Sequence, residues 1–306
     1  MAAEASRPIR FRHRTNTMKA LETTSRSPWK NVLFATDLSP ASERALYLAL
    51  NIARQYESKL YAVHLILPDI YPVVPPSGPN LARQKDQSRN ESKRHLQDTF
   101  SGVRHEILFE RGEVWPTLSR LIQENEVDLL IVGTHARLGV VKAVLGSVAE
   151  EIFREAPCPV LTVRPSLSSD AKQAADLKRI LYATDFSFES LAAVPYALTL
   201  ACGFRAQLIL LHVVDQPQRN HVSTALLTLR DLVPLGTELT SKPKCLVEHG
   251  KPADTILKVS AAEDAHVIVL GVRRAEGHEI SSTHRLRSAT YKIVAQAACP
   301  VLTVRR

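Results

Sequence analysis

The chain contains two copies of one long sequence pattern. NVLFATDLSPASERALYLALNIA at residues 31–53 returns as RILYATDFSFESLAAVPYALTLA at 179–201, and APCPVLTVR at 156–164 returns as AACPVLTVR at 297–305. The copies are roughly 140 residues apart, a whole domain length that far exceeds the repeat of about 20 to 50 residues in a solenoid. The sequence therefore predicts two tandem domains with the same fold.

The length and composition of the chain are sufficient for two separate hydrophobic cores. It has 306 residues, of which 45% are hydrophobic and 23% charged. This is enough for two cores of about 130 residues each. We expect a basic leader at residues 1–28, a first domain at 29–165, a polar linker at 166–177 and a second domain at 178–306.

The positive charge of the chain is partly a property of its leader. The net charge is +8, and residues 1–28 contribute +4 of it through six basic and two acidic side chains. The leader lacks hydrophobic periodicity and a signal-peptide core, so we expect it to be disordered. It is either an inert leader, with Met18 as an alternative start, or a contact for an anionic partner. Because half of the net positive charge lies in this leader, the charge of the chain does not indicate a folded nucleic-acid-binding surface.

The cysteines and the hydropathy are typical of a cytoplasmic protein. The four cysteines form no CxxC pair, and Cys158 and Cys299 occupy equivalent positions in the two copies. We expect small core residues rather than metal ligands or redox centres. The sequence has no run of 18 apolar residues, so we expect no membrane-spanning segment. The expected location is therefore the cytoplasm.

Short β-branched runs alternate with longer amphipathic stretches in both halves. Strands are expected near 31–36, 59–66, 104–110, 128–133 and 159–164, and again near 179–184, 206–214, 243–248, 266–271 and 300–305. Helices are expected near 40–56, 82–99, 113–125 and 147–155, and near 189–203, 221–233, 252–263 and 287–297. This order predicts an α/β fold with a parallel sheet and helices on both faces. Ligands of such sheets bind at the carboxyl ends of the strands.

The loop GTHARLGVVKAVLGS at residues 133–147 is the strongest candidate site. Gly133 ends a predicted strand, Gly139 lies in the loop, and Gly146 and Ser147 begin a predicted helix. Backbone N–H groups at a helix start bind phosphate, and glycines allow it to approach closely. The loop is neither a Walker A motif nor GxGxxG.

A second candidate is the sequence ATD, which ends the first strand of each copy. A carboxylate at this edge, Asp37 or Asp185, can accept hydrogen bonds from a ribose or an adenine amino group. The alternative is that Asp37 caps the following helix, with Ser39 as the competing cap. His64 and His212 end equivalent strands, which favours a structural role common to both halves.

Five motifs of the chain match one known family. They are VLFATDLSPAS, the His64–Leu65 strand end, RGEVWPTL at 111–118, the glycine loop and APCPVLTV. Over about residues 29–306 the chain resembles the universal stress proteins in their tandem-domain form. The resemblance implies five-stranded parallel domains of the adenine nucleotide α-hydrolase-like type and dimers formed through the last strand. It also implies binding of ATP or ADP, with or without Mg²⁺.

The resemblance implies one nucleotide site made of three segments. The first two strand ends surround the adenine and ribose, and the glycine loop surrounds the phosphates. The residues carried over by position are Ala35, Thr36, Asp37, Leu65, Val132, Gly133, Ala136, Gly139, Gly146, Ser147 and Val148. Ala136 replaces the middle glycine of the pattern G-x2-G-x9-G-S/T. If that position needs a positive φ, alanine costs about 1 kcal/mol or more and weakens binding; otherwise its methyl group is tolerated.

The second copy departs from this pattern in its glycine loop. Residues 271–288 are three residues longer, with Arg274 at the middle glycine and Arg287 where Gly146 stands. The second domain is therefore either a degenerate, structural or protein-facing copy, or it binds an anion through its arginines.

Three functions are compatible with the sequence. The first is a stress-response protein whose first domain binds ATP or ADP. The second is a slow ATPase or autophosphorylating enzyme, although no metal-carboxylate cluster or clear general base is evident. The third is a nucleotide-free scaffold, which Ala136 favours. The two VLTV segments, at 160–163 and 301–304, are expected to pair the two halves as an internal pseudo-dimer. The sequence does not decide whether two chains also form a homodimer.

Overall fold

Strands and helices alternate along both halves of the computed structural model. It describes residues 29–39, 42–66, 87, 91, 93–133, 147–165, 172, 175–214, 219–272 and 289–305. The strands are β1 (Asn31–Thr36), β2 (Lys59–Ile66), β3 (His105–Arg111), β4 (Leu129–Gly133), β5 (Val160–Val163), β6 (Arg179–Thr184), β7 (Gln207–Val214), β8 (Lys244–His249), β9 (Val267–Val272) and β10 (Val301–Arg305). The helices are α2 (Glu43–Tyr56), α4 (Val114–Glu124), α5 (Ser147–Glu155), α6 (Phe188–Leu191), α7 (Val194–Gly203), α8 (Arg219–Asp231), α9 (Pro252–Ala262) and α11 (Ala289–Gln296).

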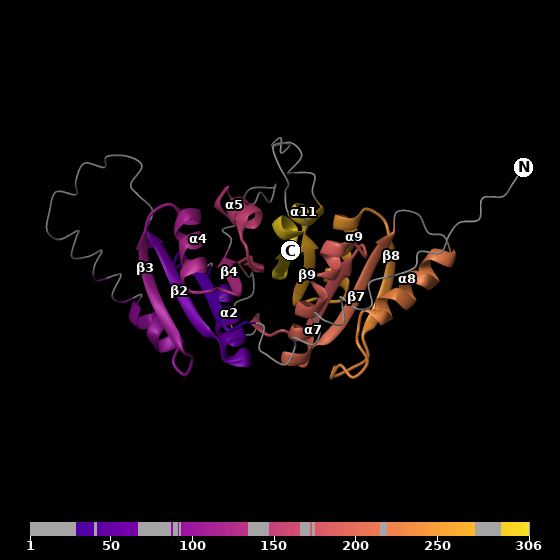
Figure 1. Cartoon of the computed structure of the whole chain (residues 1–306), viewed down its shortest axis with the longest axis horizontal. Helices are drawn as coiled ribbons and strands as arrows, with labels where there is room; N and C mark the ends of the chain where they lie inside the picture. Colours follow the sequence, from indigo (N-terminus) through magenta and orange to yellow (C-terminus); the bar gives the residue numbers. More distant parts are fainter. Residues whose placement is uncertain are drawn as a thin grey trace, which may run out of the picture.

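The strands of both halves join in one sheet. Within the described residues the sheet has ten strands in the order β3-β2-β1-β4-β5-β10-β9-β6-β7-β8. All neighbours within each half are parallel, and the two halves meet at the antiparallel pair β5 and β10. Figure 1 shows β3 and β8 at opposite ends of the long axis. The predicted α/β architecture with parallel strands is confirmed.

A pseudo-twofold axis passes between β5 and β10. Leu161 pairs with Leu302, its own repeat equivalent, and Val301 pairs with Thr162 as Val160 pairs with Thr303. This register matches the symmetric edge pairing predicted for the two VLTV segments. Because each VLTV edge meets the other within one chain, both edges are covered without a second molecule.

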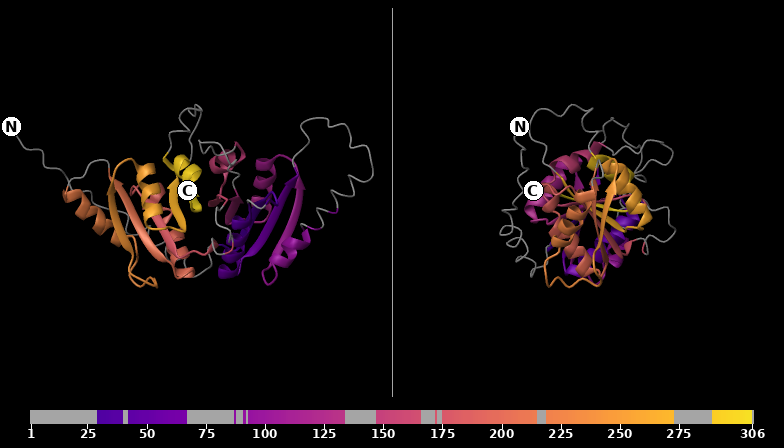
Figure 2. Two further views of the ribbon diagram at one scale, coloured as in Figure 1. Left: turned by 180° about the vertical axis from the view of Figure 1, so that it is seen from behind. Right: turned by 90° about the vertical axis from the view of Figure 1, so that its right-hand side faces the viewer.

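Helices cover both faces of the sheet, and one face has a core that runs through both halves (Figures 1 and 2). Side chains of α2, α7 and α8 pack in this shared core with Leu161 and Leu302. On the other face, α4 and α5 cover a first-half core, while α9 and α11 cover a second-half core. Alternate residues of β1 contact opposite faces, and Val32, Leu33 and Phe34 at its centre are buried, as expected for a strand between two helical layers.

Aromatic side chains join the two halves where α2 meets α7. Trp29 is fully buried, with its ring 5.0 Å from that of Tyr56 and 6.2 Å from that of Tyr196. The Tyr56 hydroxyl donates to the Thr199 carbonyl oxygen at 2.9 Å, and its ring lies 6.1 Å from that of Phe204. Tyr56 and Phe204 are repeat equivalents, so this contact also lies across the pseudo-twofold axis.

One predicted helix is wrong in its extent. The helix expected over 189–203 is divided into α6 and α7, with Ala193 as the N-cap of α7. Pro195 lies in the first turn of α7, because its missing N–H and ring are tolerated only there. The expected leader and half of the helix expected over 82–99 lie outside the described residues, and residues 93–99 are helical as predicted. At the end of the expected linker, Ala175 and Leu177 are buried in the shared core.

The described residues also bear on the cysteines and on membrane insertion. All four cysteines are free thiols, and Cys158 and Cys299 are buried. Burial raises the pKa of Cys158 to about 12 and that of Cys299 to about 11. In the part of the chain that the structure describes, every helix is too short or too polar to span a bilayer.

Candidate functional site

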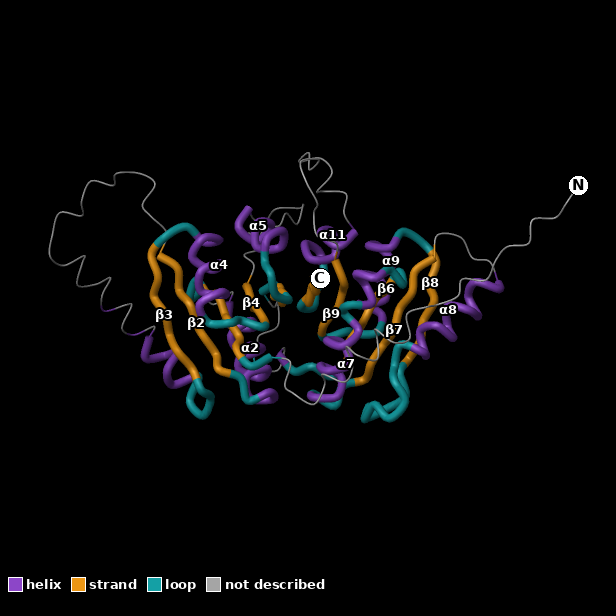
Figure 3. Tube along the Cα trace, in the orientation of Figure 1, coloured by secondary structure: helices purple, strands orange, loops and turns teal. Residues whose placement is uncertain are grey.

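The register of the sheet places several predicted site residues at one edge. Ala35 of β1 is paired with Val132 of β4, and Thr36 is paired with His64 of β2. The next residues along these strands, Asp37, Gly133 and Leu65, therefore lie together at the carboxyl ends of three neighbouring strands. In Figure 1 the arrowheads of β3 and β8 mark their carboxyl ends at the upper edge of the sheet, and Figure 3 shows the same strands in the same orientation.

The turn after β1 is held by its own side chains. Thr36 Oγ1 accepts the N–H of Leu38 at 3.0 Å and lies 3.0 Å from Ser42 Oγ. Asp37 Oδ1 accepts the N–H of Ser39 at 3.1 Å and its hydroxyl at 2.8 Å. Leu38 adopts a φ of 62°, which these bonds compensate. The carboxylate of Asp37 is thus fixed at the strand end and exposed to solvent.

The helix-cap alternative for Asp37 is wrong. The N-cap of α2 is Ser42, and its side chain makes no cap hydrogen bond. In the second half the cap is the serine two residues after the aspartate. Ser187, the equivalent of Ser39, caps α6 by accepting the N–H of Ser190 at 3.2 Å.

The histidine of each half fixes the end of the first strand. His64 Nδ1 lies 3.1 Å from the Thr36 carbonyl oxygen, and His212 Nδ1 lies 2.8 Å from that of Thr184. Since a carbonyl only accepts, each Nδ1 carries the proton. Two equivalent bonds in the two halves confirm the structural role expected for these histidines.

The second half repeats the turn closely. Thr184 Oγ1 accepts the N–H of Phe186 at 2.9 Å, and Phe186 has a φ of 60°. Asp185 Oδ1 accepts the N–H of Ser187 at 2.9 Å. Partial burial favours a higher pKa for Asp185, but the hydrogen bonds from Ser187 outweigh it and hold this pKa below its ordinary value.

The two strand ends differ in how closely the following helix approaches. A Cβ atom on Gly133 would lie 3.5 Å from Ser42 Cβ, an ordinary contact. A Cβ atom on Gly271, the equivalent glycine of β9, would lie 2.0 Å from the Glu189 carbonyl oxygen and 2.5 Å from Ser190 Cα. In the second half the start of α6 therefore lies directly against the glycine backbone.

The end of β6 is also more deeply buried than the equivalent end of β1. Ala183 and Thr184 are 5% and 6% exposed, whereas Ala35 and Thr36 are only half-buried. One cause is Tyr182, whose hydroxyl donates to the Ser190 carbonyl oxygen at 2.8 Å and ties α6 to β6. Phe34 occupies the equivalent position of β1 and has no hydroxyl to make this bond. Sequence reasoning missed this difference, although the repeat alignment displays it.

Several predicted site residues cannot be placed. Ala136, Gly139 and Gly146 lie outside the described residues, as do the arginines of the loop 271–288. Ser147 and Val148 form the first turn of α5, as expected from the sequence, but their side chains are not described.

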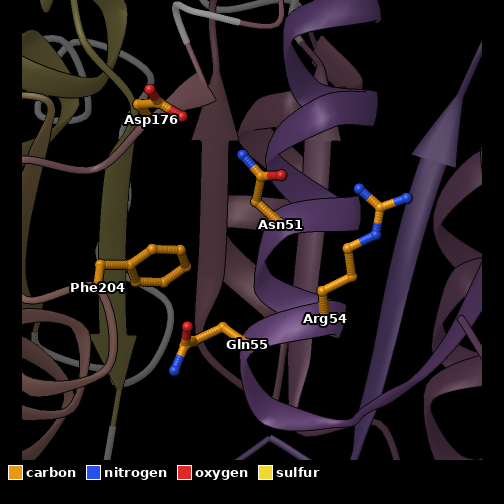
Figure 4. A pocket seen from close by; sticks show the side chains of 5 residues that line it. All are labelled: Asn51, Arg54, Gln55, Asp176 and Phe204. Atoms are coloured by element: carbon orange, nitrogen blue, oxygen red, sulfur yellow. The ribbon is translucent and has the colours of Figure 1, made fainter.

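A surface depression of about 310 Å³ lies elsewhere, between the two halves (Figure 4). Asn51, Arg54 and Gln55 of α2 line it together with Asp176 and Phe204. These α2 residues belong to its last turns, which precede the start of β2. The depression therefore lies toward the amino ends of the strands and does not coincide with the site at their carboxyl ends.

Comparison with known proteins gives a consistent assignment for both halves. The family model described as "Universal stress protein family" matches residues 28–164 and again residues 176–305. A universal stress protein of Methanocaldococcus jannaschii is 27% identical over 143 residues, which cover 44% of this chain and 82% of that protein. A putative universal stress protein of Staphylococcus haemolyticus is 31% identical over 140 residues, covering 44% of this chain and 85% of its own length.

Solved structures share the arrangement of the whole chain. A universal stress protein from Archaeoglobus fulgidus has a TM-score of 0.69 and 19% identity, covering 90% of this chain and 98% of its own. A putative universal stress protein from Pseudomonas aeruginosa has a TM-score of 0.62 and 16% identity, covering 91% and 94%. At these identities the likeness establishes the fold of the tandem pair.

Proposed function

The chain belongs to the universal stress protein family, and from this premise we propose that its first domain binds one ATP or ADP. The site is formed by the carboxyl ends of β1, β2 and β4 together with the start of α5. The second domain supports the assembly and leaves its equivalent site empty.

The observation that carries this proposal is the asymmetry of the two strand ends. In the first half the turn 36–39 presents a fixed carboxylate, and the helix start remains at ordinary contact distance from Gly133. In the second half the same turn exists, but α6 lies against Gly271 and the strand end is buried. Among the described residues the first strand end is the less tightly covered of the two, which supports placing the ribose there.

Each part of the proposed site has a physical role. Asp37 accepts hydrogen bonds from the ribose hydroxyls, and the backbone of Leu65 contacts the base. Val132 and Gly133 lie against the ribose, because β4 is the neighbour of β1 in the sheet. The N–H groups at the start of α5, from Ser147, bind phosphate where the helix dipole favours negative charge.

Nucleotide release from the purified protein tests the proposal. Denaturation should liberate about one ATP or ADP per chain, or titration of nucleotide-free protein with ATP should saturate at one site. If denaturation releases no nucleotide and the protein also fails to bind added ATP, the proposal is refuted. GTP serves as the control for base recognition, and steady phosphate release that Asp37→Ala abolishes would assign the protein to the enzymes instead.

A matched pair of substitutions locates the site. Asp37→Ala should weaken ATP binding about tenfold or more, since a hydrogen bond to a charged group contributes about 1.5 to 3 kcal/mol. Asp185→Ala removes the equivalent carboxylate in the second domain and should change neither affinity nor stoichiometry. Equal effects of the two substitutions would contradict the assignment to the first domain.

The loop position that departs from the family pattern provides a gain-of-function test. Ala136→Gly should tighten ATP binding, because glycine adopts a positive φ without the cost of about 1 kcal/mol that alanine carries. A cost of that size corresponds to about a fivefold change in the dissociation constant, measurable by calorimetric titration. Unchanged or weaker affinity would show that position 136 does not limit binding.

A further inference from the structure

We propose that Arg305, near the end of the second domain, is a positioning residue for the phosphate part of the first-domain site. It holds α5 at its C-terminal end, while the N-terminal end of the same helix receives the phosphates. This inference rests on the function proposed above and adds a residue from the other half of the chain.

Arg305 contacts α5 in two ways. Its guanidinium donates a hydrogen bond from Nη1 to the Arg154 carbonyl oxygen, and its Cζ lies 5.2 Å from the centre of the Phe153 ring. The carbonyl of Arg154 belongs to the last turn of α5, where carbonyl groups lack partners within the helix. A positive charge at this end also interacts favourably with the helix dipole.

The packing of α5 divides it between the two domains. Ile152 is buried in the first-half core under α4, whereas Phe153 packs against the second-half core. The helix has nine residues, so it is about 13 Å long and moves as one rigid unit. A change in its C-terminal anchor therefore tilts its first turn, from which the N–H groups reach the phosphates.

The repeat provides a built-in control for this contact. Arg164 of the first half is the equivalent of Arg305, and its Nη1 donates to the Ala295 carbonyl oxygen of α11 at 2.8 Å. The exchange is thus reciprocal, with each domain holding the last helix of the other. Val294 occupies the position that corresponds to Phe153, so an aromatic ring supports the arginine contact only at α5.

The experiment compares nucleotides with and without phosphates. The dissociation constants of ATP and of adenosine are measured for the full-length chain and for Arg305→Gln, Arg305→Lys and Arg164→Gln. We expect Arg305→Gln to weaken ATP binding about fivefold or more, the range typical of coupled sites, and to leave adenosine binding unchanged. Arg305→Lys retains the charge and can still donate to a carbonyl oxygen, so it should lose less ATP affinity, and Arg164→Gln should match the unaltered chain.

The outcomes separate this inference from the function on which it rests. If the unaltered chain binds ATP but Arg305→Gln retains its affinity, the inference is wrong and the proposed function stands. If ATP and adenosine binding fall together in Arg305→Gln, the arginine acts through general stability, and the inference is wrong as well. Failure of the unaltered chain to bind ATP overturns both.

Discussion

Replacement of Gly271 by alanine should destabilise the protein far more than the same replacement of Gly133. The new methyl carbon at position 271 would lie 2.0 Å from the Glu189 carbonyl oxygen and 2.6 Å from its carbonyl carbon. An ordinary contact is about 3.5 Å. The start of α6 would therefore have to move by roughly 1.5 Å, and all of the atoms that obstruct it belong to the backbone.

The magnitude follows from the contacts that such a movement breaks. Overpacking in a close-packed core costs about 1 to 3 kcal/mol. Displacement of α6 also strains the buried bond from Tyr182 to Ser190, and loss of such a bond costs about 1 kcal/mol. We therefore expect Gly271→Ala to lower the free energy of unfolding by about 3 kcal/mol or more. Among the described residues a Cβ atom on Gly133 meets only ordinary contacts, with Ser42 Cα at 3.7 Å where the equivalent Ser190 Cα lies 2.5 Å from position 271, so Gly133→Ala should change stability by less than about 1 kcal/mol.

Urea unfolding followed by circular dichroism measures the difference. For an m-value of about 3 kcal/mol/M, Gly271→Ala should lower the midpoint by about 1 M. Trp115 packs against the first-half core and Trp29 contacts Tyr196 of the second half, so tryptophan fluorescence reports on the first domain and on its contact with the second. Equal midpoint shifts for the two variants, or a negligible shift for Gly271→Ala, would refute the tight contact between α6 and β9.

Three further predictions follow from the described contacts. Tyr182→Phe removes one of the donors to the Ser190 carbonyl, which still accepts the N–H of Ala193, so it should lower the free energy of unfolding by about 0.5 to 1.5 kcal/mol; Phe34→Tyr, at the equivalent position of β1, is the reciprocal variant. Because the folded pKa of Asp185 is lowered, its contribution is present above the ordinary value of 3.8 and is lost as the pH falls through the folded pKa. The stability difference between the unaltered chain and Asp185→Asn should therefore shrink in urea titrations between pH 6 and pH 3, and a pH-independent difference would contradict this. Cys158 and Cys299, with pKa values of about 12 and 11, should react with a thiol reagent at pH 8 only after unfolding, whereas the two partly exposed cysteines should react in the folded chain.

The sequence predicted the sheet because apolar strands and amphipathic helices follow simple periodicities. Strands β1, β2 and β6 have the predicted bounds, and β1 and β6 are each an apolar run that ends at a threonine. The division of α6 from α7 was not predicted, although Pro195 carries its signal. Helical periodicity continues across the break, and only the missing proline donor distinguishes the two possibilities.

The candidate site was predictable in its position but not in its asymmetry. The repeated ATD motif locates a carboxylate at each strand end, and both turns have the same hydrogen bonds. What distinguishes the halves is the separation between the helix start and the glycine of the neighbouring strand. One contribution to that distance is a hydroxyl present in Tyr182 and missing in Phe34, which donates to the Ser190 carbonyl eight residues along the chain. A tertiary distance of this kind has no signature in periodicity or spacing.

Because β5 pairs with β10 inside one chain, the pairing does not depend on protein concentration, and the two halves can change in sequence independently. In a dimer of identical chains, the two sites appear or vanish together upon dilution, and every substitution alters both of them. Here the partner strand is tethered in the same polypeptide, so its effective concentration is independent of the amount of protein. One half can therefore lose its ligand and become a permanent support, while the other half retains a site at constant stoichiometry. Because the two halves are covalently linked, they stay paired even where their sequences differ.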